Sequence, residues 1–129
     1  MISMLLVVLT LSCTVVCYAS EYVASKQFVD SNTFTYIGKA SKENYASYAT
    51  VRITDIYDAN MKISNYSRVY TQIRCYNSIA ASAKIIQKGV WTDITIEPQF
   101  RSSGNVLQYY CMGNNSSLDC YITGTFISH

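Results

Sequence analysis

Hydrophobic and polar residues alternate one by one along several stretches of the chain, which is the pattern of a β-strand with one buried face. The clearest stretch covers residues 68–76. Such alternation predicts an antiparallel strand with one side on the core and the other in water. Its inward side chains are Val69, Thr71, Ile73 and Cys75. Its outward side chains are Arg68, Tyr70, Gln72, Arg74 and Tyr76.

A second strand is predicted over residues 90–97 by the same alternation. Pro98 follows and is expected to end the strand, because proline has no N–H group for the hydrogen-bond ladder. Trp91 falls on the outward side and is therefore a candidate exposed aromatic residue. The predicted inward side chains are Val90, Thr92, Ile94 and Ile96.

The alternation slips by one residue in the segment that begins at residue 50. Val51 and Ile53 share a phase, whereas Ile56 falls out of it. An extra residue in one strand produces this slip, so a β-bulge is expected near Asp55.

The remaining strands are weaker, and together they set the fold class. Residues 106–112 and 120–127 flank a run of turn-forming residues and are expected to pair as a terminal β-hairpin. Residues 79–86 fit a short helical turn as well as a strand, because alanine is frequent there. About seven or eight short strands predict a single antiparallel β-sandwich or a small barrel. Further strand candidates cover residues 22–29, 33–40 and 82–87.

The first 19 residues have the composition of an export signal. They are apolar and uncharged, and the apolar run is shorter than the roughly 20 residues that a membrane span needs. Cys17 and Ala19 place small residues before Ser20, so cleavage after Ala19 is expected. Residues 1–19 would then be a signal peptide and residues 20–129 a secreted domain without stable membrane insertion. An uncleaved anchor and a lipidated Cys13 or Cys17 remain alternatives.

Charge limits the classes of partner that this chain can bind. Ten Lys and Arg against eight Asp and Glu give a net charge of +2, with the two signs interspersed along the sequence. No basic stripe for nucleic acid is visible, so we expect no nucleic-acid partner.

Three cysteines remain after signal cleavage, so at most one intrachain disulfide can form. Cys111 would lie opposite Cys120 in the predicted hairpin, which favours that pair. Cys75 with Cys120 is the alternative and would tie two sheets together. Three buried free thiols are a third alternative, and an unpaired cysteine could also link two chains as a disulfide dimer.

No catalytic or metal-binding pattern emerges from the residues. His129 is the only histidine and the last residue, and a chain end is a poor place to hold an imidazole for catalysis. Asp93 and Glu97 share a strand face about 13 Å apart, which exceeds the carboxylate separation of glycoside hydrolases. The acidic stretch at residues 55–60 lacks the glycine and the acid spacing of a calcium loop. We therefore expect no enzyme activity, no metal site and no cofactor.

The outward row of residues 68–76 is the candidate binding surface. Tyrosine and arginine provide large contact areas at low entropic cost. The competing interpretation is that outward tyrosines only stabilise the sheet through cross-strand pairs. The candidate ligand-binding residues are Arg68, Tyr70, Gln72, Arg74, Tyr76 and Trp91. Tyrosines that could extend the surface or belong to the core are Tyr57, Tyr66, Tyr109, Tyr110 and Tyr121.

Residues 112–124, Met-Gly-Asn-Asn-Ser-Ser-Leu-Asp-Cys-Tyr-Ile-Thr-Gly, with Lys-Gly-Val-Trp at 88–91, resemble short exported all-β proteins of Gram-positive bacteria without assigned function. The resemblance implies compartment and fold rather than activity. The sequence thus favours an extracellular binding module for a glycan, cell wall or protein. The alternative is a secreted toxin-like or antimicrobial, bacteriocin-like effector, although the small net charge argues against direct membrane attack.

Overall fold

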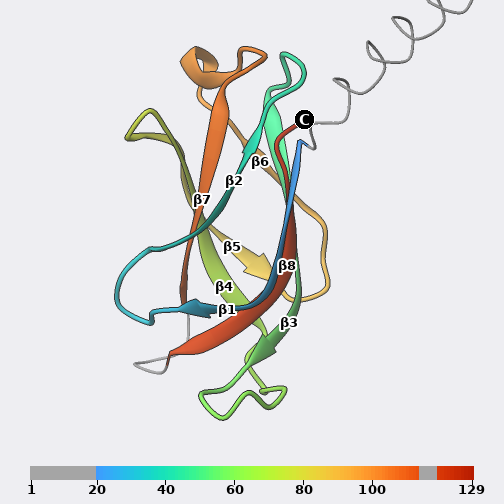
Figure 1. Cartoon of the computed structure of the whole chain (residues 1–129), viewed down its shortest axis with the longest axis vertical. Helices are drawn as coiled ribbons and strands as arrows, with labels where there is room; N and C mark the ends of the chain where they lie inside the picture. The colour runs from blue at the N-terminus through green and yellow to red at the C-terminus, as the bar shows by residue number, and fades with distance from the viewer. Residues whose placement is uncertain (1–19, 114–118) are drawn as a thin grey trace, which may run out of the picture.

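The computed structural model describes residues 20–113 and 119–129, which form eight β-strands and one short 3-10 helix (Figure 1). The fold is all-β, as the alternation predicted. No helix in the described part of the chain is long and apolar enough to cross a membrane. The strands are β1 (Glu21–Val29), β2 (Thr35–Ser41), β3 (Tyr48–Tyr57), β4 (Arg68–Cys75), β5 (Ser78–Gln87), β6 (Thr92–Thr95), β7 (Val106–Gly113) and β8 (Cys120–Ile127), with the 3-10 helix at Pro98–Phe100.

The strands form two four-stranded antiparallel sheets that pack face to face as a β-sandwich. Sheet A has the order β1-β8-β3-β6, and sheet B has the order β2-β7-β4-β5. Each sheet ends in two edge strands, so the fold is an open sandwich rather than a small barrel.

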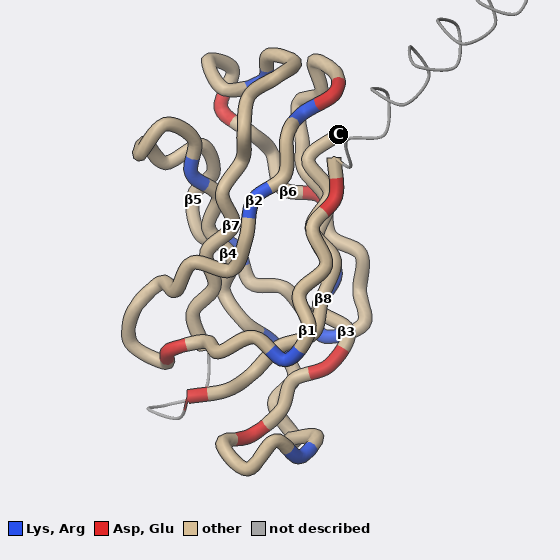
Figure 2. The backbone as a smooth tube through the Cα atoms, viewed as in Figure 1, with Lys and Arg blue, Asp and Glu red and all other residues tan. Residues whose placement is uncertain are grey.

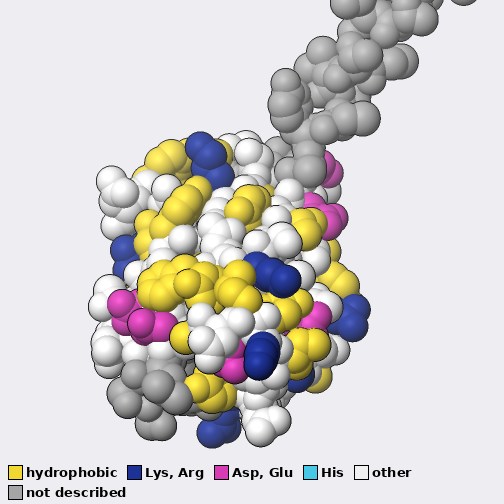
Figure 3. Space-filling model, turned by 60° about the horizontal axis from the view of Figure 1, so that its bottom comes forward, with side chains coloured by type: hydrophobic (Ala, Val, Ile, Leu, Met, Phe, Trp, Pro, Cys, Tyr) yellow, Lys and Arg dark blue, Asp and Glu magenta, His cyan; other side chains and the backbone are white. Residues whose placement is uncertain are grey.

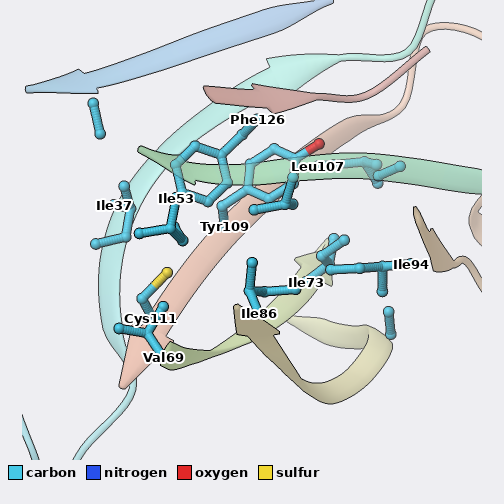
Figure 4. Packing of buried hydrophobic residues seen from close by; sticks show 14 of the residues in the cluster. Ile37, Ile53, Val69, Ile73, Ile86, Ile94, Leu107, Tyr109, Cys111 and Phe126 are labelled. Atoms are coloured by element: carbon cyan, nitrogen blue, oxygen red, sulfur yellow. The ribbon is translucent and has the colours of Figure 1, made fainter. Parts of the chain in front are cut away.

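The predicted terminal hairpin is wrong. β7 lies between β2 and β4 in sheet B, whereas β8 lies between β1 and β3 in sheet A. The two strands face each other across the core, where the rings of Tyr109 and Phe126 pack with centroids 5.0 Å apart (Figure 4). This arrangement packs the inward faces of the two strands against each other, whereas a hairpin would place both strands in one sheet.

The core occupies the space between the two sheets and is lined by the inward positions of each strand (Figure 4). Val69, Ile73 and Cys75 of β4 are fully buried, which confirms the predicted phase of that strand. The predicted bulge is also confirmed, because the β3–β8 register shifts between Ile53 and Asp55. The shift returns Ile56 to the core, where it is fully buried.

Two weaker predictions are settled by the structure. Residues 79–86 lie within β5 and form a strand, not a helical turn. Ile94 and Ile96 point inward as expected, but Val90 is 52% exposed. The strand begins later than predicted because residues 87–90 form a turn, in which the Val90 N–H donates to the Gln87 carbonyl oxygen.

A buried lysine joins the end of the chain to sheet B. Lys42 is 2% exposed, and its Nζ donates to the backbone oxygen of Ser128 at 3.0 Å. The Ser128 hydroxyl donates to the oxygen of Ala40 at 2.8 Å and lies 2.7 Å from the Tyr109 hydroxyl. Burial lowers the pKa of Lys42, and the positive charge of Arg101 lowers it further. This cluster connects the residue after β8 to β2 and β7.

Candidate functional site

The outer face of sheet B brings together four of the six residues singled out from the sequence. Arg68, Tyr70, Gln72 and Arg74 alternate along β4, which is an interior strand of the sheet. Gln72 is 8% exposed, because β7 and β5 flank it on both sides. The row is therefore embedded in a continuous surface rather than set on an edge.

Arg74 is held in one position by two neighbours. Its guanidinium carbon lies 4.1 Å from the centroid of the Tyr110 ring, a cation–π contact. Its Nε donates to Oε1 of Gln72 at 2.9 Å. That bond uses one of the five N–H donors of the guanidinium, and the other four belong to its two terminal nitrogens. These two contacts hold the side chain in place, and neither of them uses the four N–H groups of the terminal nitrogens.

Tyr36 extends this arrangement to β2. Its ring packs edge-on against Tyr110, with centroids 5.6 Å apart and an interplanar angle of 66°. Tyr36 remains 44% exposed. Partial burial raises the pKa of the Tyr36 phenol, and Tyr22 and Tyr110 raise it further, so the hydroxyl stays neutral at physiological pH. We call Tyr36, Tyr110 and Arg74 the tyrosine–arginine stack.

Tyr76 does not belong to this face. Tyr76 and Asn77 both have positive φ angles, 50° and 62°, and they form the two-residue turn between β4 and β5. A type I′ hairpin turn requires this conformation at both central residues. The Tyr76 side chain is 72% exposed, and its hydroxyl donates to Oδ1 of Asn105 at 3.0 Å. The strand therefore ends one residue earlier than the alternation suggested.

Trp91 lies on the other sheet. It immediately precedes β6 at the edge of sheet A and is 51% exposed. The guanidinium carbon of Arg52 lies 5.5 Å from its ring centroid. Trp91 and the tyrosine–arginine stack thus belong to different sheets and cannot form one surface.

The other tyrosines divide among three environments. Tyr109 is fully buried in the core, and Tyr66 packs against the core at the surface. Tyr121 and Tyr57 occupy paired positions on sheet A. Phe28 packs edge-on against Tyr121, with centroids 5.7 Å apart. Figure 3 brings this end of the molecule forward and shows hydrophobic side chains with charged ones among them.

The sequence did not single out the central member of the stack. Tyr110 is only one of several tyrosines that the sequence offers as extensions of the surface, and no sequence pattern points to Tyr36. Both become neighbours of Arg74 through the strand order β2-β7-β4, which pairs Tyr36 with Tyr110 and Tyr110 with Gln72. No local sequence pattern predicts such a pairing between distant segments.

Cys75, Cys111 and Cys120 are buried free thiols in the structure. Cys111 is paired with Thr35 and Thr71, and Cys120 is paired with Val29, so the two cysteines are not neighbours within one sheet as the hairpin had suggested. Burial raises the pKa of the Cys111 thiol to about 12 and that of the Cys120 thiol to about 11. Burial also raises the pKa of Cys75.

His129 is held more firmly than a chain end was expected to be. Its ring lies 4.9 Å from the Tyr48 ring, centroid to centroid, and its Nε2 is 2.8 Å from Oγ1 of Thr50. The same hydroxyl donates to Oδ1 of Asp93 at 2.8 Å. In a catalytic triad the carboxylate binds the imidazole, whereas here it accepts from the hydroxyl. This group fastens the end of the chain to sheet A.

Within residues 20–113 and 119–129, no pocket is formed and no group of three or more metal-ligating side chains comes together. The candidate site is therefore taken as the tyrosine–arginine stack, whose side chains contact one another on the outer face of sheet B. Comparisons with family models, with curated proteins and with solved structures find no match to this chain.

Proposed function

We propose that this chain is a small secreted, non-catalytic binding module that binds a glycan on the outer face of sheet B. The tyrosine–arginine stack is the observation that carries the proposal. Its three side chains come from three adjacent strands and contact one another before any ligand arrives. Such preorganisation reduces the entropy lost when a ligand binds.

The chemistry of the stack suits a sugar. The exposed Tyr36 ring offers an apolar surface and a hydroxyl group, which together suit a ligand with an apolar body and polar edges. The guanidinium of Arg74 offers a planar set of donors for oxygen atoms, fixed by Gln72. Because the described residues form no pocket, the outer face of sheet B suits a chain that lies along it better than a small molecule that must be enclosed.

The proposal predicts that binding depends on sheet B and not on sheet A. Arg74→Ala and Tyr110→Ala should each weaken binding at least tenfold, which corresponds to about 1.4 kcal/mol. Trp91→Ala removes an exposed aromatic residue from sheet A and should change binding less than about twofold. Affinity electrophoresis with polygalacturonate, alginate, galactomannan and a soluble β-glucan, and sedimentation with peptidoglycan, measure these changes.

Arg74→Lys separates a binding defect from a folding defect, because it keeps the charge but loses the planar fork that Gln72 orients. We expect it to fold with a wild-type circular dichroism spectrum and to bind more weakly than the wild type. Failure of the wild-type protein to bind any of the five probes would overturn the proposal. Loss of binding in Trp91→Ala alone would move the site to sheet A.

Export is part of the same proposal and has its own test. We expect the protein recovered from the culture medium to begin at Ser20, because residues 1–19 have the composition of a signal peptide. Alkylation in denaturant without reduction, followed by intact mass measurement, should label three thiols, because Cys75, Cys111 and Cys120 are free but buried in the folded protein. A mass that includes residues 1–19 would contradict cleavage, and a single labelled thiol would indicate the intrachain disulfide that the sequence allowed.

A further inference from the structure

The charges are distributed unequally between the two sheets. The strands of sheet B contain four cationic residues and no aspartate or glutamate, whereas the strands of sheet A contain three acidic and two cationic residues. Figure 2 shows the acidic positions on sheet A and in the loops at the ends of the sandwich. The sheet B cations are Lys39, Arg68, Arg74 and Lys84, and the sheet A charges are Glu21, Lys26, Arg52, Asp55 and Asp93.

Three of these cations lie on the face of the tyrosine–arginine stack. Lys39 and Arg68 are exposed, and Arg74 is half-buried within the stack. Lys84 is engaged elsewhere, because its Nζ donates to the backbone oxygen of Asp93 at 2.9 Å. Asp30 keeps its negative charge but lies in the loop after β1, outside the strands of sheet B, where its Oδ1 accepts from the N–H of Asn32 at 2.6 Å. The face is therefore cationic without a carboxylate on its strands to neutralise it.

The three cations are spread over the sheet rather than gathered at one point. Arg68 and Arg74 are six residues apart on β4, which separates them by about 20 Å. Lys39 and Arg74 both pair with Gln108, so two strand spacings, about 10 Å, separate their backbones. A single phosphate or carboxylate could not contact Arg68 and Arg74 together, because about 20 Å separates their backbones. Such spacing suits a ligand that carries negative charges at repeated intervals.

We infer that the ligand of this face is an anionic polysaccharide whose sugar units carry carboxylates, as in a polymer of uronic acids. The inference rests on the proposed function and names the class of glycan. The carboxylates would pair with Lys39, Arg68 and the terminal nitrogens of Arg74, where a planar carboxylate matches the guanidinium fork. The sugar ring of the unit whose carboxylate pairs with Arg74 would contact Tyr36.

Two other polyanions fit the face less well. A polyol phosphate has the repeated charge but no sugar ring in its backbone to cover Tyr36. Single-stranded nucleic acid uses successive open aromatic rings for its bases. In the stack, Arg74 already covers the ring of Tyr110, which leaves Tyr36 as the exposed ring.

The test compares polygalacturonate with the same polymer after its carboxyl groups have been reduced to alcohols. We expect the wild-type protein to bind polygalacturonate at least tenfold more tightly than the reduced polymer, and to lose affinity as salt is raised. The double variant Lys39→Gln with Arg68→Gln should bind polygalacturonate at least threefold more weakly, because it keeps the tyrosine–arginine stack but removes two of the cations. Lys26→Gln with Lys62→Gln is the matched control. It removes the same net charge outside sheet B and should leave binding unchanged.

Each outcome separates this inference from the proposal on which it rests. Equal binding of both polymers, with both still sensitive to Arg74→Ala, would overturn the anionic ligand and keep the glycan-binding face. Tighter binding of polyglycerol phosphate or of single-stranded polythymidylate than of polygalacturonate would also overturn the inference. An equal loss in the two double variants would show that net charge, rather than the sheet B face, is responsible.

Discussion

Raising the pH from about 9 to about 11 is expected to lower the free energy of unfolding by about 4 kcal/mol, because two buried thiols resist ionisation in the folded state. Burial raises the pKa of Cys111 from 9.0 to about 12 and that of Cys120 from 9.0 to about 11. In this pH range the unfolded chain releases protons that the folded chain retains. Each such group therefore removes up to about 1.4 kcal/mol of stability per pH unit.

Other buried groups modify this loss. The pKa of Cys75 and that of Tyr109 are also raised by burial, so these two groups act in the same direction. Lys42 acts in the opposite direction, because its lowered pKa makes the folded state give up a proton before the unfolded state does. One lysine offsets only part of the contribution of several acids, and the stability is expected to decrease overall.

Urea denaturation across this pH range, under reducing conditions and followed by circular dichroism, measures the effect. Cys111→Ala is the control, because it removes the thiol with the larger of the two shifts and should make the pH profile less steep. A profile that stays flat in the wild-type protein would contradict the prediction. If the profile became steep only after a reducing agent was added, the thiols would have been joined in a disulfide.

Gly124→Ala is expected to lower the stability by about 3 kcal/mol, because no space exists for a methyl group at this position. Gly124 faces the core from β8 and is paired with Ala24 of β1 and Ile53 of β3. A Cβ atom there would lie 2.7 Å from the backbone oxygen of Arg52 and 3.2 Å from Cδ1 of Ile53. The backbone of β3 can move away only by disturbing its pairing with β8.

Thermal unfolding measures this prediction, and a decrease in Tm of about 15 °C is expected for a domain of this size. Thr125→Ala is the matched control, since Thr125 is the next residue of the same strand and points outward, where it is half-buried. It should cost less than about 1 kcal/mol. Equal decreases in the two variants would show that the strand position, and not the close approach at Gly124, controls stability.

Much of the fold could be predicted because side-chain alternation is a local property. Val69 and Ile73 are buried as expected, because successive residues of a strand point to opposite faces wherever the strand lies. The bulge in β3 was visible for the same reason, since Ile56 could return to the core only if an extra residue was inserted.

The candidate site was only partly predictable. Arg68, Tyr70, Gln72 and Arg74 share a face because they alternate along a single strand. Tyr76 was misplaced because the alternation was continued into a turn, although Asn77 beside it is a residue type that accepts positive φ angles.

The chain by itself determined which side of each strand is buried, and the tertiary structure decided what lies against that side. Burial of apolar surface has little directional preference, so an alternating strand is stabilised equally well in either sheet. The separation of β7 from β8, the contact of Arg74 with Tyr110 and the close approach at Gly124 all depend on which distant strands pair. Strand pairing is set by the packing of the whole core, and no short segment of the sequence contains that information.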